Sequence, residues 1–201
     1  MTHFLSFLFV LGTFFWLSYR TIIRFVPGDL TITFFDVGQG DSTLIQFPKG
    51  YTLLIDAGRG FRNWDIGKQV LVRELGLRAI LTLDAFLMTH PDQDHLFGAR
   101  GIFSELKVGE FWTNEWFLKQ PTKLLNERLA QAVTRGSQVR RFSKEEILKI
   151  EGASIGLLPL VVNEKPNNNC LLAWLEFGKC RLLLTGDIEE PAEPRGAAGQ
   201  G

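Results

Sequence analysis

Four polar side chains that can bind a metal follow one apolar segment, and this arrangement constrains the fold more than any other feature. Residues 83–89 are typical of a buried strand, and His90, Asp92, Asp94 and His95 follow within six residues. The two aspartates repel each other unless a cation neutralises them. Imidazole and carboxylate together suit zinc, manganese or iron better than calcium. The alternative is a solvated acidic turn in which Asp94 caps the next helix.

The composition is that of a folded domain. The chain has 201 residues, 45% hydrophobic and 22% charged, which excludes a disordered chain, a collagen and a disulfide-stapled mini-protein. Lys and Arg together number 22, as do Asp and Glu. The zero net charge gives no overall basic field of the kind that marks many nucleic-acid binders.

Apolar patterning predicts a layered α/β or α+β domain. Three short runs rich in β-branched and aromatic residues predict consecutive antiparallel strands over 30–37, 42–47 and 51–57. Helices are predicted over 66–78, 96–106 and 121–135. Further strands are predicted over 107–112, 138–142, 153–158, 170–177 and 180–185.

The last two predicted strands form a hairpin whose register can be written down. A two-residue loop at 178–179 places Phe177 opposite Cys180, so that paired residue numbers sum to 357. Asp187 then lies opposite Cys170. In this register the two cysteines are too far apart for a disulfide, and we expect both to be buried as apolar residues.

The N-terminal segment carries no charge before Arg20. Nineteen helical residues span about 28 Å, close to the thickness of a bilayer core. Trp16 and Tyr19 lie where an interfacial aromatic belt is expected. A signal peptide would need an early Lys or Arg and small residues at a cleavage site, and neither is present. A buried core helix is the other alternative. Residues 1–26 therefore predict a membrane anchor.

Two further segments place acids at tight turns. FDVGQGDS holds Asp36 and Asp41 between two strands, and LLIDAG ends a strand with Asp56. Glycines in these segments allow left-handed backbone and close approach of a neighbour. Either segment alone is explained by ordinary turn chemistry.

Together these motifs resemble the metallo-β-lactamase superfamily, and within it the C-terminal domain of the ComEC family of competence proteins. The resemblance covers roughly Leu30 to Glu190 and is carried by TFFDVGQGDS, TLLIDAG, LMTHPDQDHLFGA and LLLTGD. It implies a four-layer αββα sandwich over residues 29–188. ComEC-like proteins pair a transmembrane channel region with such a domain and move single-stranded DNA into the cell. The resemblance therefore implies a metal-dependent hydrolase of DNA phosphodiesters.

The resemblance also implies a role for each residue of the main cluster. His90 and Asp92 would hold a first zinc or manganese ion, Asp94 and His95 a second, and Asp187 would bridge the two. Asp94 would also orient the attacking water. In the wider superfamily a His stands at the position of Asp92, and the substitution is usual for ComEC-like members.

Other polar residues take supporting roles by the same resemblance. Asp36, Asp41 and Asp56 stand where the family has structural acids or acids that orient the ligands. Asn169 lies near the segment where many superfamily members supply a His, and its carbonyl could bind a hard metal.

One departure concerns the C-terminal end. Superfamily members continue past the TGD aspartate with a helix, a strand and a further His ligand, whereas the histidines here are at positions 3, 90 and 95. We therefore expect a truncated or frameshifted reading frame, an incomplete sandwich and an incomplete second metal site. The residues 189–201 predict a disordered tail.

The implied partners are single-stranded DNA, the bacterial inner membrane, and upstream channel helices or competence machinery. Arg20 and Arg24 favour a cytoplasmic domain, whereas degradation of the strand left outside favours the opposite side. Basic residues such as Arg140 and Arg141 could hold phosphates, while four nearby aromatics could stack on bases: Phe111, Trp112, Trp116 and Phe117. The alternative is that these aromatics are ordinary core residues. Two other functions stay open, a metallohydrolase acting on another substrate and an inactive fragment or DNA-binding part of a channel.

Overall fold

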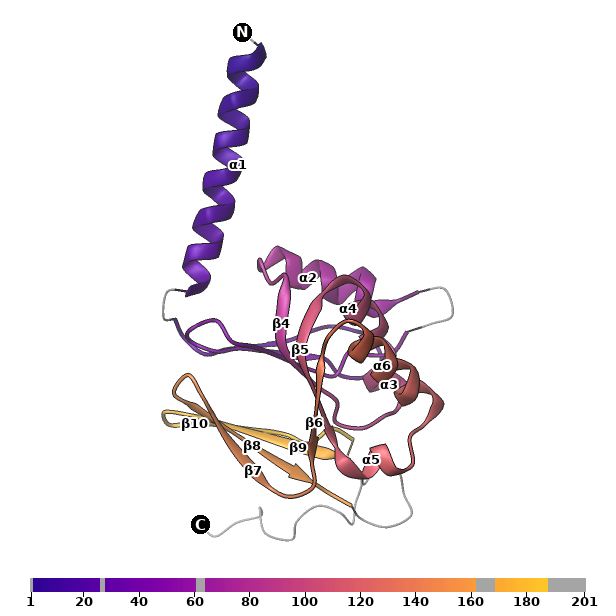
Figure 1. Cartoon of the computed structure of the whole chain (residues 1–201). Coiled ribbons are helices and arrows are strands. Elements are labelled where there is room, and N and C mark those ends of the chain that lie inside the picture. The colour runs from indigo at the N-terminus through magenta and orange to yellow at the C-terminus, as the bar shows by residue number, and fades with distance from the viewer. Residues whose placement is uncertain (1, 26–27, 61–63, 162–168, 188–201) are drawn as a thin grey trace.

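Two β-sheets pack face to face, and helices cover the outer face of the larger one (Figure 1). The structure is a computed structural model that describes residues 2–25, 28–60, 64–161 and 169–187. The larger sheet has the order β1-β2-β3-β4-β5-β6. Its strands are β1 (Thr31–Phe34), β2 (Thr43–Gln46), β3 (Thr52–Ile55), β4 (Thr82–Leu87), β5 (Lys107–Asn114) and β6 (Gln138–Phe142).

The larger sheet changes from antiparallel to parallel pairing at β3. The strands β1, β2 and β3 pair antiparallel, which confirms the prediction for the first three strands. The strands β3 to β6 pair in parallel. Because parallel strands point the same way, the carboxyl ends of β3, β4 and β5 meet at one edge, the usual place for a site in such sheets.

The helices lie between and after the parallel strands. They are η1 (Gly67–Leu71, a π-helix), α2 (Val72–Leu77), α3 (Gln93–Leu96), α4 (Ala99–Glu105), α5 (Glu115–Lys119) and α6 (Lys123–Thr134). The helix predicted over 66–78 is formed by η1 and α2, and the one predicted over 96–106 begins earlier and divides into α3 and α4. Helices and sheet bury a shared core in which the rings of Phe86, Phe103 and Phe111 lie 5.4–5.7 Å apart.

The smaller sheet is antiparallel throughout, with the order β10-β9-β8-β7. Its strands are β7 (Glu146–Ile150), β8 (Ala153–Pro159), β9 (Leu171–Phe177) and β10 (Cys180–Leu184). The hairpin register is confirmed, because Cys180 pairs with Phe177 and Leu184 with Ala173. Both cysteines are free, as predicted. The expectation that both are buried is wrong for Cys180, which is exposed because it opens an edge strand beside the turn.

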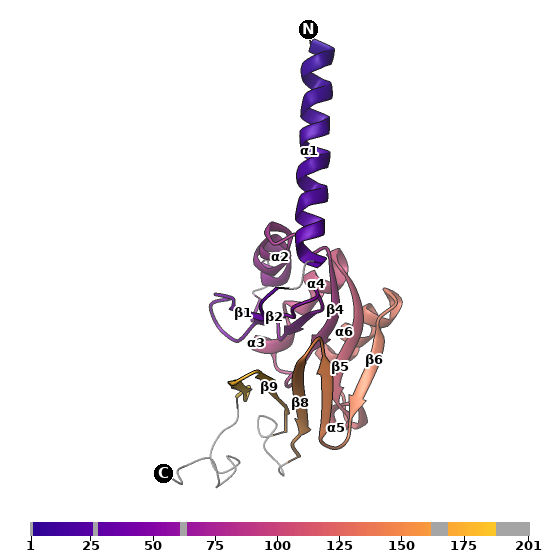
Figure 2. The ribbon, with the colours of Figure 1, turned by 90° about the vertical axis from the view of Figure 1, so that its left-hand side faces the viewer.

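A second core joins the inner faces of the two sheets. It contains Leu53 and Leu87 from the larger sheet and Ile155, Ala173 and Leu175 from the smaller one. The described residues thus form three layers, one of helices and two of sheets, in agreement with a metallo-β-lactamase fold. The fourth layer of the expected αββα sandwich is not seen there, since no described helix covers the outer face of the smaller sheet (Figures 1 and 2). The predicted tail lies outside the described residues.

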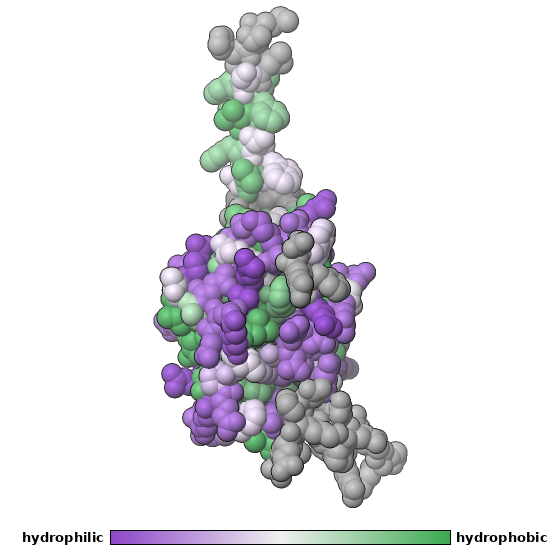
Figure 3. Space-filling view, turned by 90° about the vertical axis from the view of Figure 1, so that its right-hand side faces the viewer, coloured by the Kyte–Doolittle hydropathy of each residue, from purple (hydrophilic) through white to green (hydrophobic). Residues whose placement is uncertain are grey.

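The N-terminal helix α1 (Thr2–Phe25) extends away from the sheets (Figure 2). The apolar side chains described in it, between Phe7 and Leu17, are exposed, with Phe9 74% and Phe14 72% accessible. They contrast with the largely hydrophilic surface of the domain (Figure 3). Among the described residues, however, no helix combines the length and the apolar character that crossing a membrane requires. The membrane anchor predicted over residues 1–26 is therefore not supported.

The close packing of Gly156 against the Trp174 ring predicts that adding one methyl group at position 156 destabilises the fold. A Cβ atom at Gly156 would lie 2.0 Å from the indole, so Gly156→Ala must displace a half-buried ring. We expect it to lower the free energy of unfolding by about 1–3 kcal/mol, measured by urea titration. Gly76→Ala in α2 is the matched control, because nothing lies within 4 Å of its added Cβ. We expect the control to raise stability by about 0.5–1 kcal/mol, and equal effects would contradict this account.

Candidate metal centre

The candidate site lies where the carboxyl ends of the parallel strands meet the end of β10. Asp56 directly follows β3, and His90 and His95 follow β4. Asp41 lies two residues before Thr43, where β2 begins. Asp187 lies three residues after the end of β10, in the other sheet. The site therefore draws its side chains from both sheets.

Asp56 is the hub of the hydrogen-bond network. It is 1% exposed and has φ of 55°, an unusual backbone conformation for a residue other than glycine. Its Oδ1 accepts from the Thr89 amide at 2.9 Å, and its Oδ2 accepts from the Thr89 hydroxyl at 2.6 Å. The same Oδ2 lies 2.8 Å from Nδ1 of His95. One buried carboxylate thus ties the end of β3 to the polar segment after β4.

This network fixes the tautomers of both histidines. An ionised carboxylate only accepts hydrogen bonds, so Nδ1 of His95 donates to Asp56. The Thr89 hydroxyl donates its hydrogen to Asp56, and its oxygen lies 3.0 Å from Nδ1 of His90. Its oxygen therefore accepts from that nitrogen. In both neutral rings the proton is on Nδ1, and the Nε2 lone pair is available to a metal.

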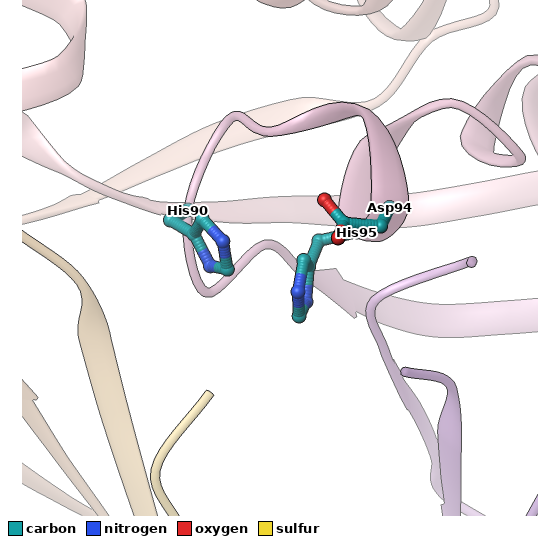
Figure 4. Close-up of side chains that lie close together, drawn as sticks. All are labelled: His90, Asp94 and His95. Atoms are coloured by element: carbon teal, nitrogen blue, oxygen red, sulfur yellow. The ribbon is translucent and has the colours of Figure 1, made fainter. Parts of the chain in front are cut away.

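The two Nε2 atoms are buried without a hydrogen-bond partner among the described residues. His90 is 1% exposed and His95 is fully buried, and their ring centroids lie 3.9 Å apart. Such orphaned polar atoms are costly unless something binds them. Figure 4 shows both rings and the nearby carboxylate of Asp94, which comes from α3. The donor atoms of His90, Asp94 and His95 all lie within 4.8 Å of one another.

A second set of donors shares His95. Donor atoms of Asp41, His95 and Asp187 also lie within 4.8 Å of one another. Nε2 of His95 is 3.3 Å from Oδ2 of Asp187, although the two do not have hydrogen-bond alignment. Imidazole nitrogen with carboxylate oxygen is a donor set that suits zinc or manganese. The residues present thus fit one or two divalent ions.

The electrostatics agree with a site built for a cation. Burial lowers the pKa of His95, but its hydrogen bond to Asp56 and the charges of Asp56 and Asp187 outweigh burial and raise the pKa to about 9. Burial, followed by the charge of His95, lowers the pKa of His90. Burial, with the charges of Asp56 and Asp187, raises the pKa of the Asp41 carboxyl. A divalent ion that binds here at neutral pH would therefore replace a proton on His95.

The other predicted ligands lie close by or support the site. Oδ2 of Asp92 is 3.8 Å from Nε2 of His90, a spacing compatible with two ligands of one ion. Asp36 is exposed, and its Oδ1 accepts from the Gly38 amide at 3.1 Å, so it stabilises its own turn. Asn169 is buried two residues before Leu171, whose amide donates to the Thr89 carbonyl at 2.8 Å.

The capping alternative for the acidic segment is not supported. The residue at the N-cap position of α3 is Asp92 rather than Asp94, and its side chain makes no capping hydrogen bond. Neither the Asp92 nor the Asp94 carboxylate therefore caps the amino end of α3.

Most of the aromatics considered for base stacking are core residues. Phe111, Trp112 and Phe117 are at most 2% exposed, so they cannot stack on a nucleic acid. The Arg140 guanidinium lies over the Trp112 ring at 5.6 Å and pairs with Glu146 at 3.2 Å. The core interpretation is correct for these residues.

Two hollows differ in their relation to the site. A pocket of about 180 Å³ is lined by Asp41, Asp56 and Thr89 together with residues 183–186, and it has room for an ion and several waters. A larger one of about 710 Å³ lies at the amino ends of β4 and β5, remote from the histidines. The smaller pocket borders the candidate metal centre through Asp41, Asp56 and Thr89.

Comparison with known proteins agrees with this geometry. Residues 35–197 match the family described as the metallo-beta-lactamase superfamily. The chain belongs to this superfamily. A protein of Thermotoga maritima classed as a metallo-beta-lactamase superposes with a TM-score of 0.55 at 16% identity, covering 80% of this chain and 79% of that one. At that identity the likeness shows the fold alone.

Two curated relatives are more similar in sequence. ComE operon protein 3 of Bacillus subtilis (strain 168) is 28% identical over 173 residues, covering 79% of this chain and 22% of that protein. YcaI of Escherichia coli (strain K12), described as uncharacterized, is 28% identical over 173 residues, covering 84% and 20%. The chain thus spans about a fifth of the length of the curated relatives it matches. The predicted resemblance to ComEC-type proteins is confirmed.

The hydrogen bonds of Thr89 predict that its hydroxyl controls metal affinity. Thr89→Val keeps the side-chain shape but removes the donor to Asp56 and the acceptor for His90. We expect manganese or zinc affinity, measured by calorimetric titration, to fall about 10–100-fold. Thr89→Ser keeps the hydroxyl and should bind as the wild type does. If Thr89→Val binds the metal as tightly as the wild type, the hydrogen bonds of the Thr89 hydroxyl do not orient the ligands.

The raised pKa of His95 predicts how the stability of the metal-free protein depends on pH. The contribution of protonated His95 is fully present below its ordinary pKa of about 6.5 and is lost as pH rises through about 9. We expect the free energy of unfolding in EDTA to fall by about 2 kcal/mol between pH 7 and pH 9, measured by urea titration. Asp56→Asn should flatten this slope, and a slope unchanged by that substitution would assign it to other groups.

Proposed function

We propose that this domain is a metal-dependent phosphodiesterase that cleaves single-stranded DNA. The observation that carries the proposal is the pair of buried Nε2 atoms of His90 and His95, which face carboxylates and have no hydrogen-bond partner in the described part of the chain. A site of this kind is typical of metallohydrolases rather than of binding modules.

The proposed site gives each ligand a role. His90 and Asp92 would hold one ion, Asp94 and His95 would hold the other, and Asp187 would be shared by the two. When bound, the ions supply Lewis acidity, which neutralises charge on a phosphodiester and activates water. Asp94 orients the attacking water, since its carboxylate is half-buried beside both histidines. Asp56 and Thr89 keep both imidazoles in the tautomer that the site requires.

DNA as the substrate rests on the resemblance to ComEC-type proteins. The similarity to ComE operon protein 3 supports it, and the proposed activity would serve DNA uptake as part of a larger machinery. A second candidate is a phosphodiesterase acting on a small substrate. The burial of Phe111, Trp112 and Phe117 favours it, because these rings are not exposed for stacking on a long single strand.

A cleavage assay tests the proposed function. The full chain is stripped with EDTA and then supplied with manganese or zinc, using end-labelled single-stranded DNA and a chromogenic phosphodiester as substrates. We expect metal-dependent DNA cleavage that Asp94→Asn lowers by about 100-fold or more. Asp29→Asn is the matched control, because Asp29 is exposed at the start of the domain, outside the site.

The two substrates distinguish the candidates. Turnover of the chromogenic phosphodiester with DNA left intact would move the assignment to a small substrate. No turnover of either substrate by a protein that binds both metals would overturn hydrolysis altogether.

A further inference from the structure

The carboxylate of Asp41 lies at the candidate metal centre and not only in the turn that carries it. Its carboxylate belongs to the group of donors that also contains His95 and Asp187, all within 4.8 Å of one another. The shared imidazole is fully buried, and its Nε2 has no hydrogen-bond partner among the described residues. Two carboxylates thus converge on one buried nitrogen that has a lone pair to offer.

The loop that carries Asp41 is held rigidly against the site. A Cβ atom at Gly40 would lie 1.8 Å from the Asp94 carbonyl oxygen, and Gly40 has φ of 92°, so only glycine allows this approach. The Asp41 carbonyl accepts from the Gly58 amide at 2.9 Å. The next residue, Ser42, donates its hydroxyl to the Asp56 carbonyl at 3.1 Å. The carboxylate is therefore placed by fixed backbone and not by a free loop.

Three carboxylates lie around the His95 ring. Asp56 is 2.8 Å from its Nδ1, Asp187 is 3.3 Å from its Nε2, and Asp41 belongs to the same group of donors as Asp187. Asp56 is satisfied by three hydrogen bonds from Thr89 and His95. Among the described residues, Asp41 and Asp187 accept no such set of hydrogen bonds, so both carboxylates are available to a cation.

We propose that Asp41 is a direct ligand of the ion bound by His95 and Asp187. The assignment deepens the proposed function and rests on the metal centre that it requires. With Asp94, this gives one imidazole and three carboxylates, an oxygen-rich donor set of the kind that suits manganese. Nδ1 of His95 is engaged by Asp56, so this ion would bind through Nε2.

Manganese titration of the full chain tests the role of Asp41. The protein is stripped with EDTA and dialysed, and bound Mn²⁺ is counted by electron paramagnetic resonance and by calorimetry. We expect Asp41→Asn to weaken one equivalent of Mn²⁺ by more than about tenfold. Asp29→Asn, the same chemical change at an exposed position outside the site, should leave both equivalents unchanged.

A second measurement separates a ligand from a structural acid. Removing one of several repelling carboxylates should leave the Tm of the metal-free protein unchanged or higher. The Tm gain on adding Mn²⁺ should be smaller for Asp41→Asn than for the wild type. A structural acid would instead lower the metal-free Tm and leave the gain unchanged.

The possible results separate this inference from the proposed function. If Asp41→Asn binds Mn²⁺ as the wild type does, the ligand role is wrong while the metal centre stands. If the wild type binds neither Mn²⁺ nor Zn²⁺, both the ligand role and the metal-dependent function are wrong. If Mn²⁺ binding depends on Asp41 but no phosphodiester is cleaved, the ligand role stands and the proposed function is wrong.

Discussion

The candidate site depends on one buried carboxylate. Asp56 accepts three hydrogen bonds, from the amide and hydroxyl of Thr89 and from Nδ1 of His95. Through the Thr89 hydroxyl it also sets the tautomer of His90. A buried carboxylate without these donors would be strongly unfavourable, and the histidines without it could present either nitrogen. The fold of the segment after β4 and the chemistry of its imidazoles therefore have the same physical cause.

The packing of the two sheets completes the site. Asp187 is carried by the end of β10, whereas the histidines and the other acids belong to the larger sheet. The distance of 3.3 Å between Asp187 and His95 thus depends on how the inner faces pack, including Leu53, Ile155 and Leu175. The apolar core between the sheets therefore helps to determine which ligands could share an ion.

Much of this arrangement could be predicted from the sequence, for identifiable reasons. The turn at 178–179 fixed the hairpin register, and with it the position of Asp187, because a two-residue loop leaves no freedom. The cluster after β4 was readable because its ligands are neighbours in the chain. The role of Thr89 was not, although its place directly before His90 was a usable signal. The approach of Asp41 depends on Gly40 packing against Asp94, a contact between distant segments that no local pattern reports. The strand β7 and the helix α5 were not predicted, because each has five residues and is too short for a clear hydrophobic periodicity.

The same groups that prepare the site for an ion work against the metal-free fold. Five aspartates, Asp41, Asp56, Asp92, Asp94 and Asp187, lie around the two buried imidazoles. Within the described ranges, Asp56 alone among them accepts three hydrogen bonds. Folding without a cation must accept that repulsion and the two orphaned Nε2 atoms. An ion that binds only the folded chain adds stability in proportion to RT ln(1 + [L]/Kd), about 2.7 kcal/mol at a hundred times Kd. Metal binding would therefore be linked to folding through the network around Asp56. Changes in that network should appear in metal affinity before they appear in the apolar cores.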